Sequence, residues 1–386
     1  MHALTLHGVR MLSVLLAALA ALALPAAAGA NASLKVGFLD NAYAEASPGA
    51  FWQDLADLNV GFMRWDLQWK VIAPERPDEE RNPADPAYHW GATDAFVVGA
   101  AEHGLQDRVM FTVWRTPDWA AAVRNRGALE AQMPRVAAWR NFVAAAARRY
   151  SGTYTPPGAT QPLPRVISWE TWNEPNAYFA FRPQFVHGRA VAPRNYATLL
   201  AALRREVNAV MPFKPTFVAG AMYKQGGPQS ITPLDFLRGL HAARARFDVL
   251  SMHPYNSRPG LGLQDGIGQS TTNPRFIGVG NFETFIAAAN RIFRHRYPIW
   301  ITEFGWATQT PGKTQFVTTF AKQARFAAQA IASFRRMPQV ERLSWFLIRD
   351  MPYKPVGAWY TTGLRRADDA RKPSFGSWQR ATEGLE

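Results

Sequence analysis

Two short motifs place a glutamate directly after an apolar, strand-like run. Glu174 belongs to a Trp-Asn-Glu-Pro motif at 172–175, and Glu303 to an Ile-Thr-Glu-Phe-Gly motif at 301–305. Cleavage of a glycosidic bond needs two carboxyl groups, one to donate a proton and one to act as nucleophile or base. The pair therefore indicates a glycosidase, provided that the fold brings the two together. In the structural alternative, each glutamate is only the ion-pair partner of a surface arginine.

Strand-like runs alternate with amphipathic, alanine-rich helical stretches along the chain. Strands are predicted at 34–39, 61–65, 108–114, 166–172, 216–219, 248–253, 298–303 and 340–346. Helices are predicted at 50–58, 94–103, 134–150, 195–210, 232–245, 282–293 and 314–334. This alternation predicts an α/β fold, a single-domain (β/α)8 TIM barrel. In such barrels the active site lies at the carboxyl ends of the strands, where both glutamates fall.

These motifs resemble those of clan A glycoside hydrolases, retaining barrel enzymes with catalytic glutamates on strands four and seven. The motif at 172–175 resembles their strand-four motif, and 301–306 their strand-seven nucleophile segment. His-Pro-Tyr at 253–255 resembles their strand-six motif. The segments 61–69 and 116–120 are most similar to family 39 and related bacterial exopolysaccharide hydrolases, with family 5 next. The resemblance covers nearly all of the chain after residue 30.

The resemblance implies catalytic roles that the chemistry also supports. Glu174 would be the general acid/base, with its pKa raised by a partly desolvated pocket and a neighbouring carboxylate. Glu303 would be the nucleophile, kept ionised by Arg64 and steered by a hydrogen bond from Tyr255. Asp66 is interpreted as a loop or capping residue.

The resemblance also implies a set of substrate-binding residues. Asn173 would bind the sugar 2-hydroxyl, and His253 would orient the site or contact sugar hydroxyls. Platforms for sugar rings are expected from Trp114, Trp306 and Trp345. The alternative for the histidine and the tryptophans is an ordinary place in the core.

The first thirty residues are predicted to be a secretory signal peptide, which leaves 31–386 as the catalytic domain. Arg10 precedes an apolar stretch at 11–24, and small residues follow it. An uncleaved membrane anchor is the alternative. No second long apolar run follows, so no integral membrane span is expected after cleavage. The chain has no cysteine and cannot form disulfides, and the predicted location is secreted or periplasmic in a bacterium.

The formal net charge of +14 has two interpretations. It could favour an acidic polysaccharide or an anionic surface, or it could serve solubility alone. The basic residues are scattered and accompany no nucleic-acid motif, so solubility is favoured and no nucleic-acid partner is expected. The eight histidines lie at no metal-ligand spacing, and no Gly-x-Ser-x-Gly elbow is present. Neither a metal nor another cofactor is expected.

Three hypotheses for the function share a carbohydrate partner. The first is a secreted retaining β-glycosidase that acts on a bacterial exopolysaccharide. The second is a cellulase or xylosidase type of enzyme that acts on plant polysaccharide. The third is a non-catalytic barrel that binds carbohydrate. The sequence predicts no particular sugar and no oligomeric state.

Overall fold

The computed structural model describes residues 33–123, 129–256, 275–308, 317–351 and 361–385. The predicted signal peptide, 1–30, lies outside the described residues and stays a prediction. Within the described ranges, no helix is long and apolar enough to cross a membrane.

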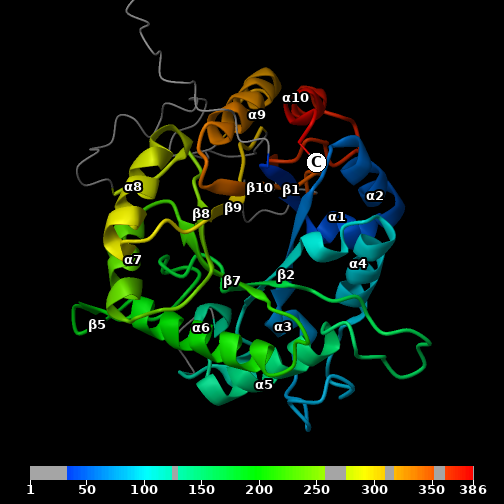
Figure 1. Ribbon diagram of the computed structural model, residues 1–386, viewed down its shortest axis with the longest axis vertical. Helices are drawn as coiled ribbons and strands as arrows, with labels where there is room; N and C mark the ends of the chain where they lie inside the picture. The colour runs from blue at the N-terminus through cyan, green and yellow to red at the C-terminus, as the bar shows by residue number, and fades with distance from the viewer. Residues whose placement is uncertain (1–32, 124–128, 257–274, 309–316, 352–360, 386) are drawn as a thin grey trace, which may run out of the picture.

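Eight parallel strands close into a barrel, as the sequence predicts (Figure 1). Around the barrel the order is β1, β10, β9, β8, β7, β4, β3, β2. The strands are β1 (Lys35–Leu39), β2 (Phe62–Gln68), β3 (Val109–Trp114), β4 (Ser168–Thr171), β7 (Thr216–Tyr223), β8 (Val249–His253), β9 (Ile299–Phe304) and β10 (Val340–Phe346). Each lies within a few residues of its predicted range.

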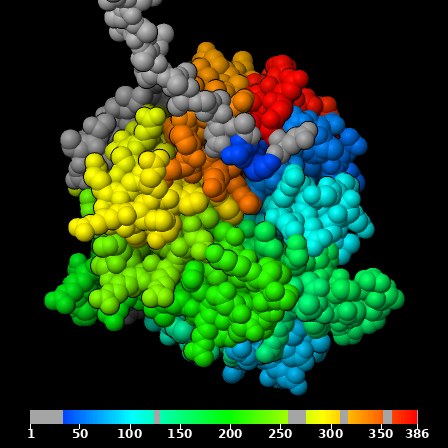
Figure 2. Space-filling model, viewed as in Figure 1, coloured from blue at the N-terminus to red at the C-terminus, as the bar shows by residue number. Residues whose placement is uncertain are grey.

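Helices surround the barrel, and consecutive chain segments follow one another around its outside (Figures 1 and 2). They are α1 (Asn41–Ala46), α2 (Pro48–Asp57), α3 (Trp69–Ile72), α4 (Gly91–Glu102), α5 (Val136–Arg149), α6 (Ala192–Asn208), α7 (Pro233–Ala242), α8 (Phe282–Phe293), α9 (Phe320–Arg335) and α10 (Pro373–Thr382). Thr232, the first residue of the predicted helix 232–245, is the N-cap of α7, because its side chain accepts a hydrogen bond from the Asp235 amide.

Several elements were not predicted from the sequence, and one helix was predicted with a wrong start. The additions are α1, α3, α10 and a hairpin of β5 (Phe185–Val186) and β6 (Arg189–Ala190). The helix predicted at 314–334 begins only at Phe320, where the Thr319 side chain caps it by accepting from the Lys322 amide. The first residues of that predicted range, 314–316, lie outside the described part of the chain.

The interior of the barrel has an apolar level with a polar level above it. The apolar level consists of Phe62, Met110, Val218, Val249 and Trp300. Side chains two residues apart on a strand face the same side. Two residues further along four of these strands come buried polar side chains, Arg64, Thr112, Ser251 and Thr302. The polar level therefore lies towards the carboxyl ends of the strands, directly beneath the predicted active site.

Trp306 and Trp345 lie in the core, which corrects their prediction as sugar platforms. Their side chains are 3% and 0% exposed. The two rings lie 5.8 Å apart, and Trp345 also packs against Phe304 and against Trp378 of α10. Because neighbouring side chains of a strand face opposite sides, Trp345 faces the helices while Phe346 faces the pocket.

We expect Trp345→Ala to reduce the free energy of unfolding by about 3–5 kcal/mol, the usual cost of removing a fully buried tryptophan. The variant also loses the hydrogen bond of 2.8 Å from Nε1 to the Thr362 carbonyl. Urea unfolding followed by circular dichroism measures the change. Val71→Ala is the control, because Val71 is 58% exposed and should change the stability by less than about 0.5 kcal/mol. Equal stability of both variants would contradict the assigned packing.

Candidate active site

The ends of β4 and β9 bring the two predicted catalytic glutamates together. Single ligand atoms of Glu174, Glu303 and His253 all lie within 4.8 Å of one another. The sequence-based expectation that the fold unites the two carboxyl groups is therefore met by the geometry. Glu174 is 7% exposed, and the side chain of Glu303 is 14% exposed.

The backbone at Glu174 is held in an unusual conformation by a bulge in β7. Glu174 has φ 48°, a left-handed value, and its amide donates to the Ala221 carbonyl at 2.9 Å. The β7–β8 register shifts between Ala219 and Met222, so this carbonyl lies in a bulge. Only glycine fits beside it at Gly220, because a Cβ there would lie 2.3 Å from the Ser251 carbonyl oxygen. The bulge thus depends on a residue far from the catalytic motifs in sequence.

Arg64 is the centre of the hydrogen-bond network below the glutamates. Its guanidinium is fully buried, and Nη1 donates to Glu303 Oε2 at 3.2 Å. Nη2 donates to Asp66 Oδ1 at 2.9 Å and to Asn173 Oδ1 at 2.7 Å. Burial opposes the charge of Arg64, but Asp66, Glu170 and Glu303 outweigh it and raise its pKa. The guanidinium is therefore a permanent positive charge beside Glu303.

The contact with Arg64 fixes the tautomer of His253. Arg64 Nη1 lies 3.0 Å from His253 Nε2, and a guanidinium can only donate. Nε2 is therefore the acceptor, and the proton is on Nδ1, which donates to Glu174 Oε1 at 3.1 Å. Burial and the charge of Arg64 lower the pKa of His253 well below its usual value, so the ring is neutral.

Glu303 is held by hydrogen bonds that favour its ionised form. The Tyr255 hydroxyl donates to Oε1 at 2.7 Å, and Arg64 donates to Oε2. Burial is the largest influence and raises the pKa of Glu303 above its usual value, while the charge of Arg64 and the hydrogen bond from Tyr255 oppose the rise. These contacts match the nucleophile role that the sequence implies for Glu303.

Glu174 is in an environment that favours the protonated form. Burial and the charge of Glu303 raise its pKa well above the usual value, and the charges of Arg64 and Lys224 only partly oppose them. A carboxyl group with a strongly raised pKa can donate a proton near neutral pH. The pKa of both glutamates is raised, but it is raised more strongly for Glu174, as an acid beside a nucleophile requires.

Two carboxylates in this network were not recognised from the sequence. Asp66 lies in β2, not in a loop, and its Oδ1 accepts from Nη2 and Nε of Arg64. Glu170 is fully buried in β4 and accepts from the hydroxyls of Thr112 and Thr302, at 2.7 and 3.2 Å. The sequence did contain a signal for Asp66. Arg64 and Asp66 are two positions apart on one strand, so their side chains face the same side.

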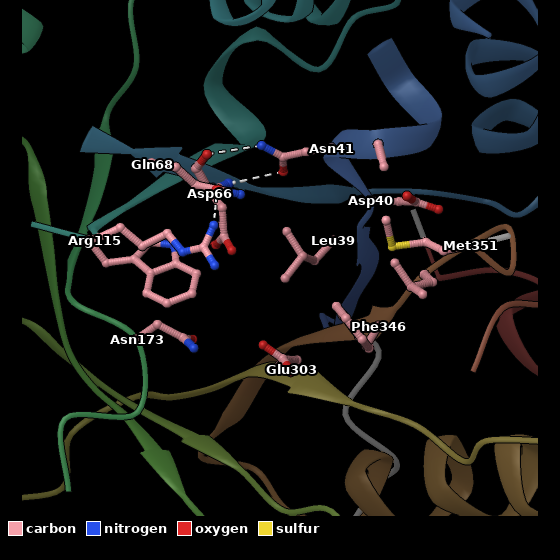
Figure 3. A pocket seen from close by; sticks show the side chains of 13 residues that line it. Leu39, Asp40, Asn41, Asp66, Gln68, Arg115, Asn173, Glu303, Phe346 and Met351 are labelled. Carbon is pink, nitrogen blue, oxygen red and sulfur yellow. Dashed lines mark hydrogen bonds between the residues drawn. The ribbon is translucent and has the colours of Figure 1, made fainter. Parts of the chain in front are cut away.

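A cavity of about 300 Å³ opens beside Glu303. Figure 3 shows Asn173 and Glu303 on one side of it, across from Asn41 and Asp66. Arg64 meets the amide oxygen of Asn173, so the amide NH2 remains for a ligand. The lining residues are Leu39, Asp40, Asn41, Ala42, Asp66, Gln68, Trp114, Arg115, Asn173, Glu303, Phe346, Leu347 and Met351.

Most of the predicted site residues meet in this region. Arg64, Asn173, His253 and Tyr255 surround the two glutamates, and Trp114 lines the pocket with the Arg115 guanidinium 4.9 Å from its ring centroid. Trp306 and Trp345 are absent from the pocket lining. Four lining residues that follow strands or end them were not predicted as site residues: Asn41, Gln68, Arg115 and Phe346. Of these, only Gln68 lies in a segment that resembles a family motif, 61–69.

The cluster of Glu174, His253 and Glu303 also meets the geometric requirement for a metal site among the described residues. Its hydrogen bonds do not suit a cation. The lone pair of His253 Nε2 faces Arg64, while Nδ1 carries a proton. Glu303 already has the positive charge of Arg64 within 3.2 Å. No step of the chemistry below is assigned to a metal, and the expectation of no metal stays a prediction.

A family model described as glycosyl hydrolase catalytic core matches residues 171–360. This range contains both glutamates and spans just under half of the chain. The match to this catalytic core supports the enzyme class expected from the sequence, a glycoside hydrolase. None of the curated protein sequences matches the chain.

Several solved structures are similar in fold. A family 39 glycoside hydrolase from Bacteroides cellulosilyticus WH2 has a TM-score of 0.61 and 18% identity, with 91% of this chain and 64% of that one covered. A monomeric β-xylosidase from Caulobacter crescentus CB15 has a TM-score of 0.57 and 15% identity, with 90% and 67% covered. A GH5_18 protein from Streptomyces cattleya, in complex with Manβ1-4GlcNAc, has a TM-score of 0.60 and 18% identity, with 91% and 80% covered. The chain thus spans about two thirds of the first two proteins.

We expect Glu303→Gln to lower the pKa of Glu174, because the negative charge that raises it is removed. Carbon-13 NMR of labelled glutamate side chains, titrated with pH, measures this pKa directly. Glu283→Gln is the matched control, because Glu283 is exposed on α8. An unchanged Glu174 titration in Glu303→Gln would show that the two groups are not coupled.

Proposed function

We propose that the protein is a retaining β-glycosidase that acts by double displacement, with Glu303 as nucleophile and Glu174 as acid/base. The observation that carries the proposal is the short separation of the two carboxyl groups, whose nearest ligand atoms lie within 4.8 Å. Retaining glycosidases have carboxyl groups about 5–5.5 Å apart, whereas inverting ones leave about 6.5–9.5 Å for a water molecule. A separation this short leaves no room for that water.

In the first step, a Glu303 oxygen attacks the anomeric carbon while Glu174 donates its proton to the glycosidic oxygen. The bond between that oxygen and the anomeric carbon breaks, the leaving group departs as an alcohol, and an ester of Glu303 forms. The hydrogen bonds from Arg64 and Tyr255 favour the ionised carboxylate before attack. They also hold its two oxygens in position.

In the second step, Glu174 takes a proton from water, and the water oxygen attacks the anomeric carbon and releases Glu303 as a carboxylate. Esterification removes the negative charge of Glu303, which is one cause of the raised pKa of Glu174. The pKa of Glu174 therefore falls when it must act as a base. Two inversions at the same carbon leave the β configuration unchanged.

The lining of the cavity supports a sugar as the ligand. The amide of Asn173 is directed towards the cavity and can donate to the 2-hydroxyl, a contact that strengthens in the transition state. Trp114 contributes apolar surface, and Asp66 and Gln68 contribute hydrogen-bond acceptors for hydroxyl groups. Phe346 supplies the aromatic surface that was expected from Trp345.

We further propose that the substrate is a bacterial exopolysaccharide and that the enzyme acts in the periplasm or outside the cell. The family-39-like segments at 61–69 and 116–120 support the substrate, and the signal-like sequence at 1–30 supports the location. Amino-terminal sequencing of the exported protein tests the location, because the mature chain is expected to begin near residue 31.

Azide is expected to rescue the two glutamate variants with opposite stereochemistry. Without azide, Glu174→Ala and Glu303→Gly should each lose about 10²–10⁴-fold in the rate on dinitrophenyl β-glycosides of glucose, xylose and mannose. Azide should attack the glycosyl-enzyme of Glu174→Ala and give the β-glycosyl azide. In Glu303→Gly it should take the place of the nucleophile and give the α-glycosyl azide. NMR of the products distinguishes them.

The control for this experiment is Glu283→Ala, which removes an exposed carboxylate and should leave the rate unchanged. The same azide anomer from both variants would contradict the assigned roles. Full activity of Glu303→Gly without azide would contradict the mechanism as a whole.

A comparison of polymers tests the substrate. We expect the enzyme without residues 1–30 to release reducing ends faster from β-linked bacterial exopolysaccharides than from plant xylan or cellulose. Glu303→Gln is the control for contaminating activity. Hydrolysis of xylan or cellulose alone would contradict the exopolysaccharide proposal and leave the retaining mechanism intact.

A further inference from the structure

An exposed aromatic ring follows the proposed acid by five residues. The Phe179 side chain is 56% exposed. Most of its neighbours in the segment that follows β4 are buried. Its ring lies 5.2 Å from the ring of Tyr223, at an interplanar angle of 85°. Tyr223 is the last residue of β7, so the pair stands at the rim where the active site opens.

The backbone that carries Phe179 is firmly held. Asn176 is fully buried, and its Nδ2 donates to the carbonyls of Tyr223 and Ile231 at 3.0 and 2.9 Å. Its Oδ1 accepts from the Tyr223 amide at 2.7 Å. At the other end of the turn, the buried Trp172 donates from Nε1 to the Ala180 carbonyl at 2.8 Å. An aromatic ring on such a fixed segment loses little conformational entropy when a ligand binds.

The Phe179 ring lies on the other side of the barrel from the cavity beside Glu303. The cavity beside Glu303 is lined from β1, β2, β3 and β10 and from Asn173, on one half of the barrel. Tyr223 ends β7, Phe179 packs against it, and neither residue lines this cavity, so the pair lies on the β4–β7 side. The charge of Glu174 contributes, after burial, to raising the pKa of Tyr223 to about 12, which agrees with their proximity.

The roles proposed for Glu303 and Glu174 determine where the attacked sugar and the leaving group of a substrate lie. The sugar that is attacked must lie against Glu303, and the acid must reach the oxygen of the leaving group. The leaving group therefore extends past Glu174, towards Phe179. Aromatic side chains present flat apolar faces, and the C–H face of a sugar ring is a flat apolar surface of similar size.

We propose that Phe179, supported by Tyr223, is a platform on which a sugar ring of the leaving group stacks. The enzyme then prefers substrates that have at least two linked sugars across the cleavage point over glycosides of small leaving groups. This inference rests on the proposed retaining glycosidase function.

The test compares two kinds of substrate in Phe179→Ala. Cellotetraose, xylotetraose and mannotetraose have a sugar as leaving group. The β-fluorides of cellobiose, xylobiose and mannobiose have the same sugars on the other side but a leaving group without a ring. We expect the variant to lose about tenfold or more in kcat/KM on the tetrasaccharide that the wild type cleaves. On the matching fluoride, its kcat/KM should stay within about twofold.

Two further variants separate stacking from general damage. Phe179→Trp should restore most of the activity on the tetrasaccharide, because it restores an aromatic face. Phe185→Ala removes another exposed phenylalanine, 39% exposed on the β5 hairpin at the edge of the molecule (Figure 1), and should leave both substrates unaffected.

Each contrary result has a distinct meaning. Unchanged tetrasaccharide hydrolysis in Phe179→Ala, or equal losses on both substrates, would overturn the platform. Wild-type turnover of fluorides but of no tetrasaccharide would also overturn it, while the retaining mechanism stands. A changed sedimentation coefficient with unchanged kinetics would assign the ring to contact between protein copies. Folded wild type that hydrolyses none of these compounds would reject the proposed function together with the platform.

Discussion

A single buried positive charge organises this active site. A guanidinium without solvent is stable only when its donors are paired. Arg64 has an acceptor on its own strand, β2, and further acceptors on β8, on β9 and just after β4. The apolar level below and the pocket above leave it no alternative partners. Asp66, Asn173, His253 and Glu303 are consequently held in fixed relative positions by one side chain. Loss of that charge would leave several buried carboxylates uncompensated, so the network must form as a unit.

The different roles proposed for the two glutamates are explained by their contacts with that charge. Arg64 and Tyr255 contact Glu303 directly, whereas Glu174 is hydrogen-bonded to a neutral histidine. His253 is kept neutral by burial and by Arg64, so it cannot stabilise a negative charge on Glu174 as an imidazolium would. One arginine thus favours ionisation at one carboxyl group and, through a histidine, leaves the other to be protonated.

The sequence predicted the barrel because its strands and helices are long, regular and strictly alternating. It predicted the glutamates because they lie in compact motifs at strand ends. It did not predict which face of β10 meets the pocket, since Trp345 and Phe346 are both aromatic and a strand covered on both sides shows no polar alternation. Asp66 and Glu170 were missed for a related reason. A charge inside a strand is recognisable as functional only when its buried partners are known, and those lie on other strands.

The left-handed backbone at Glu174 also bears on how such a protein can evolve. A residue with a side chain at φ 48° carries a conformational cost of about 1–3 kcal/mol, which glycine does not. Selection for heat resistance alone would favour replacing the acid itself. A related protein that no longer needs catalysis could therefore gain stability by replacing Glu174 with glycine and still keep the pocket. Selection for catalytic activity is what opposes this substitution.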